Sequence, residues 1–296
     1  MTEQILTSFE KVWRPRINAY LDENLRQVSD RELLTAAMRY SVLAGGKRLR
    51  PLLSLAVMTA FEQPITAANI RASVALELMH TYSLIHDDLP AMDNDALRRG
   101  EPTSHVKFGE DVAILAGDAL QPLSFQWLAD SGLPVDQIAQ LTLALAQAAG
   151  PQGMVAGQVA DVKDAGTQLA LPALQQLHRE KTGALIHYAI VAGAIQAGVP
   201  AAVRPELLAF GDAFGLAFQI YDDILDVTST AAQLGKQTHK DAGEHKNTYP
   251  SLLGLAGAKG ALAQAIATAQ TAIGRAEQLS QRDLGLLASF LTYFTN

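Results

Sequence analysis

Residues 67–93 read AANIRASVALELMHTYSLIHDDLPAMD, a long apolar run that closes on two adjacent aspartates. Alanine, leucine and other apolar residues recur in this run at spacings of three and four, which is the period of an amphipathic helix. Pro90 prevents the helix from continuing, because its ring fixes φ and clashes with the preceding turn. We therefore predict a helix over 67–88, followed by a turn that brings Asp93 back toward Asp87.

The same period continues through nearly the whole chain, whereas runs of β-branched residues bounded by turns are hard to find. The pattern predicts an all-α protein. No flexible linker or change of composition marks a boundary, so we expect one large helical domain over residues 1–296. Further helices are expected at 3–27 with a kink or break at Pro15, 31–44, 48–61, 110–130, 136–149, 153–164, 171–197, 204–228, 248–254, 257–279 and 281–294.

The composition limits the possible functions. The 296 residues carry 23 basic and 30 acidic side chains, a formal net charge of −7, which argues against nucleic acid as a partner because such proteins need a basic surface. The absence of cysteine excludes disulfides, zinc–thiolate sites, iron–sulfur clusters and a thiol nucleophile. We find neither an export signal nor an uninterrupted apolar run that would span a membrane, and expect a cytoplasmic protein.

A second aspartate cluster lies at residues 222–226, which read DDILD. Asp222 and Asp226 are four residues apart and therefore share one helix face, with Asp223 beside them. Like charges this close repel each other unless a cation lies among them. Oxygen ligands without histidine or cysteine favour Mg²⁺, which takes one or two carboxylates and completes its shell with water and phosphate oxygens. The alternative for each cluster is a solvated helix end.

Basic residues cluster at 45–51, which read GGKRLRP, and at 97–100, which read LRRG. The first segment lacks the spacing of a P-loop and could equally be the basic start of a helix. Further candidates are Lys181, Thr182, Lys236, Lys240 and Lys246, although loop lysines are commonly just solvated. Two carboxylate clusters with cations between them would make a site for a diphosphate bridged by metal ions.

These segments together resemble the short-chain trans-isoprenyl diphosphate synthases, and most closely the bacterial members that form farnesyl diphosphate. The resemblance covers about residues 40–255. It implies an all-α bundle around a central cavity, a homodimer, and condensation of isopentenyl diphosphate with dimethylallyl or geranyl diphosphate to trans-farnesyl diphosphate. The matching stretches, in the family's order, are GGKRLRP at 45–51, His80, YSLIHDDLPAMD at 82–93, LRRG at 97–100, GDAL at 117–120, KTGA at 181–184, FQIYDDILD at 218–226, LGK at 234–236 and KNTYP at 246–250.

The resemblance also implies roles for the residues at the matching positions. A trio of Mg²⁺ ions, for which Mn²⁺ could substitute, is expected on Asp87, Asp88, Asp93, Asp222, Asp223 and Asp226. The allylic diphosphate is expected to contact Arg98, Lys181, Thr182, Gln219, Lys236 and Lys246. Isopentenyl diphosphate is expected on a basic patch without a metal ion, made by Lys47, Arg50, His80 and Arg99. The catalytic set expected from these assignments is Asp87, Asp88, Asp93, Arg98, Lys181, Asp222, Asp223 and Lys236.

Product length is expected to depend on Tyr82 and Ser83, which lie below the first aspartate cluster. Tyr82 precedes Asp87 by five residues, roughly 7.5 Å along a helix. An aromatic residue at this position, together with the insertion Pro90-Ala91, resembles the bacterial enzymes that stop at C15. Ser83 supplies no second aromatic barrier.

The same residues also bear on other possible functions. A synthase that stops at C10, geranyl diphosphate, or extends to C20, geranylgeranyl diphosphate, would share these motifs and stays open. A terpene cyclase is disfavoured, because it binds no isopentenyl diphosphate and would not require Lys47, Arg50 and Arg99. A non-catalytic helical partner subunit would be expected to lose carboxylates, and none is missing here.

Overall fold

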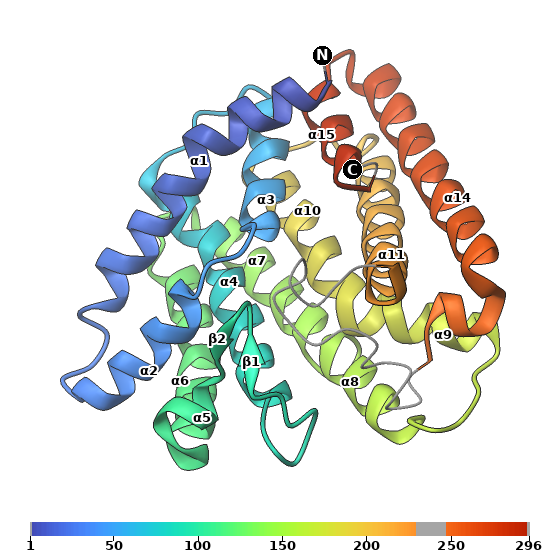
Figure 1. Ribbon diagram of the computed structural model, residues 1–296. Coiled ribbons are helices and arrows are strands. Elements are labelled where there is room, and N and C mark those ends of the chain that lie inside the picture. The colour runs from blue at the N-terminus through green and yellow to red at the C-terminus, as the bar shows by residue number, and fades with distance from the viewer. Residues whose placement is uncertain (1, 229–246, 295–296) are drawn as a thin grey trace.

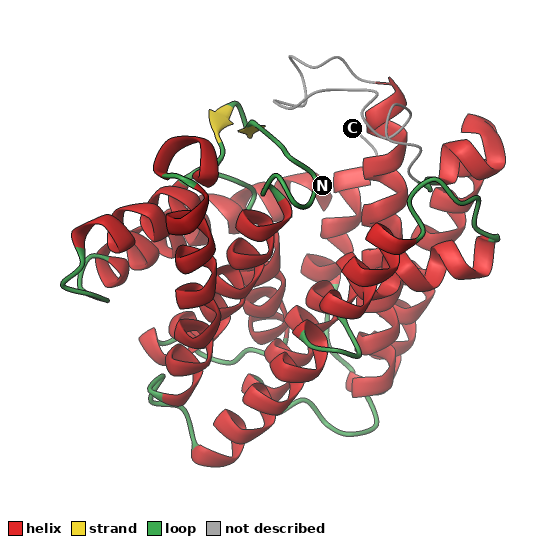
Figure 2. Cartoon of the chain, turned by 90° about the horizontal axis from the view of Figure 1, so that it is seen from below, coloured by secondary structure: helices red, strands yellow, loops and turns green. Residues whose placement is uncertain are grey.

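The structure is a computed structural model that describes residues 2–228 and 247–294. Helices form most of this part of the chain, and its strands are confined to one short hairpin (Figure 1). Figure 2 shows the helices running side by side, with the hairpin at one end of the bundle. The predicted all-α class is therefore confirmed.

The elements follow one another with short connections in most places. In chain order they are α1 (Thr2–Leu25), α2 (Glu32–Leu43), α3 (Leu49–Ala60), α4 (Ala67–Asp87), β1 (Leu97–Arg98), β2 (Glu101–Pro102), α5 (Ser104–Phe108), α6 (Glu110–Ala129), α7 (Val135–Ala149), α8 (Met154–Lys163), α9 (Leu171–His178), the π-helix η1 (Arg179–Gly183), α10 (Ala184–Gln196), α11 (Arg204–Thr228), α14 (Tyr249–Ser280), α15 (Gly285–Ser289) and the 3₁₀-helix η2 (Phe290–Phe294).

A single apolar cluster extends through the bundle from Leu6 to Phe294. Helix α11 packs along α14, α4 packs against α6, and α10 fills the space between α3, α7 and α11 (Figure 1). The aromatic side chains of Phe210, Phe214 and Phe290 are fully buried in this cluster. Burying a side chain of this size contributes about 1.5–3 kcal/mol, so the core, rather than any surface pair, holds the helices in place.

Helix α4 begins and ends where local chemistry predicts. At its start, the Thr66 backbone N–H donates to Asn69 Oδ1 at 2.9 Å in a capping box. At its end, Pro90 prevents continuation past Asp87. The Asp93 N–H donates to the Asp87 carbonyl at 2.9 Å, so the predicted return of Asp93 toward Asp87 is confirmed.

The segments predicted as helices over 3–27 and 171–197 are both helical in the structure. The segment over 171–197 contains one stretch of π-helix, η1, and α8 packs so closely against it that a Cβ on Gly157 would lie 2.2 Å from the Lys181 backbone nitrogen. Helix α1 shows no break at Pro15, because packing of the buried face that follows overrides the loss of one backbone hydrogen bond.

The polar stretch predicted over 89–109 contains regular structure. Strands β1 and β2 pair antiparallel, with Leu97 opposite Pro102, and α5 follows. The Tyr40 hydroxyl donates to the Pro102 carbonyl at 2.7 Å and ties the hairpin to α2. The hairpin therefore returns the chain to the end of α4 with Arg98 and Arg99 at its turn.

The C-terminal helices match the prediction in part. Gly254 has φ of +69° and breaks the long helix between the two predicted segments 248–254 and 257–279. The segment predicted as one helix over 281–294 is instead a short α-helix followed by a 3₁₀-helix. The tighter turn brings Phe290 and Phe294 onto Phe214 of α11, with ring centroids 6.5 and 5.0 Å away.

Helix α14 is, in the described part of the chain, the one helix long and apolar enough to cross a membrane by length and composition. Its buried residues, which include Ala258, Leu262 and Ala265, form one stripe, and the helix packs along α11 at the edge of the bundle (Figure 1). Alanine raises the hydropathy of a helix without supplying a large apolar surface. The absence of a membrane span stays a prediction.

Candidate active site

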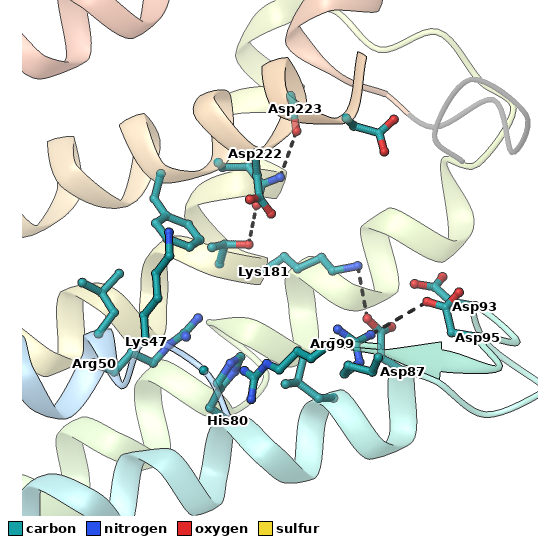
Figure 3. Close-up of a pocket in the computed structure, with 18 of the residues that line it drawn as sticks. Lys47, Arg50, His80, Asp87, Asp93, Asp95, Arg99, Lys181, Asp222 and Asp223 are labelled. Atoms are coloured by element: carbon teal, nitrogen blue, oxygen red, sulfur yellow. Dashed lines mark hydrogen bonds and ion pairs between the residues drawn. The ribbon is translucent and has the colours of Figure 1, made fainter. Parts of the chain in front are cut away.

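A cavity of about 790 Å³ opens among the loop before α3, the C-terminal half of α4, the hairpin, α8, η1 and α11. Figure 3 shows side chains from opposite walls pointing into the same space, with Lys181 extending between the two aspartate clusters. The predicted residues that line this cavity are Lys47, Arg50, His80, Asp87, Asp93, Arg98, Arg99, Lys181, Thr182, Gln219, Asp222, Asp223 and Asp226. Lys236, Lys240 and Lys246 lie outside the described residues.

The first acidic wall is formed by the end of α4 and the turn that follows it. Asp87 and Asp93 both line the cavity, and Asp95 lies beside them. The Gln158 side chain of α8 donates to Asp87 Oδ1, and Lys181 Nζ lies 3.9 Å from Asp87 Oδ2. This wall therefore presents carboxylates with cationic and amide groups already close to them.

Asp88 points away from this cavity and lines a small separate one behind the hairpin. Arg98 donates from Nε and an Nη to the two carboxylate oxygens at 2.6–2.9 Å. Burial raises the pKa of the Asp88 carboxyl above its usual value, although Arg98 opposes the shift. Because both oxygens are engaged, the geometry fits Asp88 as the residue that positions Arg98 and does not fit it as a metal ligand.

The second acidic wall comes from the last turns of α11. Asp223 Oδ1 accepts a hydrogen bond from Gln219 Nε2, and Oδ2 accepts one from the Tyr249 backbone N–H, both at 2.9 Å. Through these bonds Asp223 connects α11 to the start of α14. Asp226 is 4% exposed, and its Oδ2 has no hydrogen-bond donor among the described residues. Asp222 lines the cavity between these two groups.

These carboxylates suit divalent cations that are shared with a phosphate ligand. In the described residues, no three His, Asp or Glu side chains lie close enough to hold one ion by themselves. Mg²⁺ needs only one or two carboxylates and takes its other ligands from water and phosphate. The unpaired buried oxygen of Asp226 is the kind of atom a cation would satisfy, because an orphaned buried carboxylate oxygen is costly.

Helix η1 presents Lys181 and Thr182 between the two acidic walls. The Thr182 hydroxyl donates to Gln219 Oε1 at 2.8 Å, and Lys181 Nζ lies 2.5 Å from Asp161 Oδ2. Asp161 and Gln158 of α8 were not among the predicted site residues. These two polar residues are three positions apart on an otherwise apolar helix and therefore share one face. That pattern could have indicated them as site residues from the sequence.

A basic cluster occupies the opposite end of the cavity. Burial lowers the pKa of the Arg50 guanidinium to about 10, with nearby Arg99 adding to the shift and Glu77 opposing it. Burial, together with Arg50 and Arg99, holds the pKa of His80 well below its usual value, so its imidazole is neutral near pH 7. Arg50 Nε has no partner in the described part of the chain. Such an arrangement is electrostatically suited to an anion.

The loop before α3 holds this cluster in place. Arg48, with φ of +54°, is buried and donates to Asn18 Oδ1 at 2.8 Å, to the Val42 carbonyl at 2.7 Å and to Glu77 at 3.1 Å. These bonds stabilise a left-handed backbone that a non-glycine residue rarely adopts. The consequence is that Lys47 and Arg50, on either side of Arg48, both reach the cavity.

Gly46 has to lack a side chain for Arg99 to reach its place. A Cβ at Gly46 would lie 2.8 Å from the Arg99 guanidinium carbon, and the φ of +111° also favours glycine. An Nη of Arg99 donates to the Gly45 carbonyl at 2.5 Å. The two predicted basic segments are therefore joined directly across the cavity mouth.

Neither of the two predicted chain-length residues lines the cavity. Tyr82 is buried, and its ring is perpendicular to that of His86 with centroids 5.5 Å apart. The Ser83 hydroxyl donates to the His80 carbonyl at 2.8 Å. A role for Tyr82 and Ser83 in product length stays a prediction.

The fold and the site together define a class of protein, namely an all-helical enzyme with facing carboxylate walls and a separate basic cluster for phosphorylated ligands. Residues 31–282 match the polyprenyl synthetase family, and the chain belongs to that family. The family resemblance stated from the sequence motifs is thereby confirmed.

Known relatives cover nearly the whole chain. It is 44% identical over 280 residues to a farnesyl diphosphate synthase of Geobacillus stearothermophilus, with 94% of each chain covered. It is 42% identical over 285 residues to a chloroplastic geranylgeranyl pyrophosphate synthase of Capsicum annuum, covering 95% of this chain and 76% of that protein. A geranyltransferase of Helicobacter pylori, solved with magnesium and isoprenyl diphosphate, superposes with a TM-score of 0.86 at 35% identity, covering 99% and 96% of the two chains.

Proposed function

We propose that this prenyltransferase condenses isopentenyl diphosphate head to tail with dimethylallyl and then geranyl diphosphate, releasing diphosphate and trans-farnesyl diphosphate. The observation that carries the proposal is that one cavity is lined by two facing acidic walls and, at its other end, by a basic cluster. We infer two anion sites from this lining, one between the walls that needs cations and a second on the basic cluster that does not. A terpene cyclase, which takes one diphosphate substrate, has no use for the second site.

The allylic diphosphate is assigned to the space between the acidic walls. Asp87, Asp93, Asp222 and Asp226 are the carboxylates that would hold Mg²⁺, three ions with substrate bound, or Mn²⁺ in its place. When bound, Mg²⁺ neutralises the negative charge that builds up on the departing diphosphate. We assign Asp88 and Asp223 to positioning, because hydrogen bonds engage both oxygens of each.

The chain's own cations and amides orient the same diphosphate. Lys181 and Arg98 would contact its oxygens, and preorganised donors of this kind stabilise developing charge without reorganising. Thr182 and Gln219, joined by a hydrogen bond of 2.8 Å, would line the same diphosphate pocket. Lys236 and Lys246 are proposed to complete the site.

Isopentenyl diphosphate is assigned to Lys47, Arg50, His80 and Arg99. His80, held neutral, would donate one hydrogen bond without adding charge. The alkene carbon would then attack C1 of the allylic group as its C–O bond breaks. A proton is lost next to the new bond, and the released diphosphate is basic enough to take it, so no side chain is required as general base. Leu84 and Phe218 line the cavity and would keep water from the allylic cation.

Incubation with Mg²⁺, isopentenyl diphosphate and each allylic diphosphate in turn, followed by chromatography of the products, tests the proposal. We expect C15 as the main product. A C10 or C20 product would establish the alternative synthases, the second of which gains support from the Capsicum relative. No condensation with any substrate would refute the enzymatic function and favour a non-catalytic partner subunit.

Substitution of a wall residue tests the assignment of the metal ligands. Asp222→Ala should abolish turnover while leaving the circular dichroism of the helices unchanged. Asp212→Ala is a matched control on the same helix, because Asp212 is exposed and pairs with His187 at 2.6 Å, away from the cavity. Wild-type turnover in Asp222→Ala would remove the assignment.

A change of product length tests the role of the residues below the first cluster. Tyr82→Ala should open space between α4 and α6 and lengthen the product beyond C15, measured by chromatography. Ser83→Ala, a smaller change at the adjacent position, should leave the product unchanged. Unchanged C15 output from Tyr82→Ala would exclude this residue as the barrier.

We also propose that the protein is a single domain over 1–296, a cytoplasmic enzyme and a homodimer. The continuous apolar cluster supports the single domain. Exposed Ile114 and Leu115 on α6, which are 42% and 58% exposed, support an interface there. Light scattering across a range of concentrations tests the dimer, and Leu115→Glu should shift the mass toward that of a monomer.

A further inference from the structure

The 3₁₀-helix η2 lies against the loop that carries Lys47. The Lys47 Nζ atom lies 5.0 Å from the centroid of the Tyr293 ring, within the roughly 6 Å range of a cation–π contact. The Tyr293 hydroxyl donates to Glu10 Oε1 of α1, and its ring packs near Phe290 with centroids 6.2 Å apart. The ring is thus held by α1 and by a neighbouring ring of its own helix, so it acts as a fixed surface for the ammonium group.

Two other basic side chains that line the cavity are held differently. Lys181 lies 2.5 Å from Asp161, and Arg98 lies 2.6 Å from Asp88, so a carboxylate neutralises each of these charges. In the described residues, Lys47 has no ion pair, and the Tyr293 ring is the partner that orders it. An aromatic ring orders an ammonium group without cancelling its charge or occupying all of its N–H donors.

We propose that Tyr293 is a positioning residue for the diphosphate of isopentenyl diphosphate, because its ring holds Lys47 at the cavity wall as a cation that remains available to an anion. The inference rests on the proposed function of the basic cluster. A lysine loses side-chain freedom when it binds an anion, and a lysine that is already ordered loses less. Removing the ring should therefore weaken isopentenyl diphosphate binding roughly two- to tenfold, the range expected for ordering one such side chain.

The Glu10 contact adds to the packing that keeps the ring in its place. Burial and the neighbouring Glu10 carboxylate raise the pKa of the Tyr293 phenol, so it stays a protonated donor throughout the working pH range. Glu10 is itself held by Arg14 of the same helix at 2.7 Å. A chain of contacts therefore runs from α1 through η2 to Lys47.

Steady-state kinetics of two variants test the proposal. Tyr293→Phe keeps the ring, and Tyr293→Leu removes it. We expect Tyr293→Leu to raise the KM for isopentenyl diphosphate two- to tenfold with the KM for geranyl diphosphate unchanged, and Tyr293→Phe to stay within about twofold of wild type. Equal KM values in the two variants, or equal rises for both substrates, would overturn the proposal.

A second series of variants keeps the shape of the side chain at position 293. It tests the same role even if Tyr293→Leu does not fold. Phenylalanine analogues with increasing numbers of fluorine atoms, placed at position 293, withdraw electron density from the ring face and weaken the cation–π contact stepwise. The KM for isopentenyl diphosphate should rise along this series, and a flat series would refute the role of the ring. In a Lys47→Ala background the same series should be flat, and a slope there would equally refute it.

Anion binding without turnover separates this inference from the proposed function. A wild-type protein that forms no prenyl product refutes the proposed function alone. Calorimetry with inorganic diphosphate in EDTA then isolates the metal-free basic cluster. Two- to tenfold weaker binding to Tyr293→Leu than to Tyr293→Phe would support the positioning role, and equal binding would overturn it.

Discussion

His178 is a buried imidazole on the cavity wall, and we predict that it makes the stability of the fold depend on pH. Its side chain is 5% exposed and lies beside the Tyr249 ring, with centroids 5.7 Å apart. Its Nδ1 has no hydrogen-bond partner in the described part of the chain. Burial lowers the pKa of His178 from 6.5 to about 4, with Lys181 adding to the shift and Asp161 opposing it.

The size of the effect follows from this difference in pKa. Above about pH 6.5 the imidazole is neutral in both the folded and the unfolded chain and the stability is complete. Below that pH, the unfolded chain binds a proton that the folded chain does not, so the free energy of unfolding falls by about 1.4 kcal/mol per pH unit. The loss ends near pH 4, where the folded protein also takes up the proton, and totals about 3 kcal/mol.

Urea denaturation at several pH values between about 7.5 and 4 measures the effect. Other groups also titrate in this range, so the informative quantity is the difference between wild type and His178→Phe, which keeps an aromatic ring beside Tyr249. The wild type should lose about 3 kcal/mol more than the variant across the range. A constant difference between wild type and His178→Phe at all pH values would refute the reasoning.

Four further perturbations test the site and the core. Asp88→Asn should destabilise the fold by about 2–3 kcal/mol in urea denaturation, because Arg98 loses a charged partner. Asp226→Asn should instead raise the stability of the metal-free protein, because it removes a buried charge whose Oδ2 has no donor in the described part of the chain. Gly157→Ala should cost about 1–3 kcal/mol and reduce kcat, since its Cβ would displace the Lys181 backbone; unchanged kinetics would contradict this. EDTA should abolish condensation and leave the circular dichroism of the helices unchanged, because the apolar core holds the fold; loss of the helical signal in EDTA would show a structural metal.

The location of the site was predictable from short segments, but the role of each aspartate was not. Asp87 and Asp88 are adjacent and chemically identical, and the motif offers no means of separating them. In the structure, the Asp87 side chain lines the cavity, whereas the Asp88 side chain points away from it and pairs with Arg98. The two differ because neighbouring positions on a helix point about 100° apart. Asp223 is distinguished from Asp222 in the same way by the Tyr249 N–H.

Local patterns were enough to predict the helical class, the end of α4 at Pro90 and the segments that carry the charges, because helical period and proline chemistry act over a few neighbouring residues. The π-helix at Lys181 and the contact of Tyr293 with Lys47 depended on tertiary structure. Each arises where elements distant in sequence are pressed together by a shared core, and no local pattern encodes which atoms meet there. The carboxylates and cations could thus be found from the sequence, while the fold alone decided which of them face the cavity.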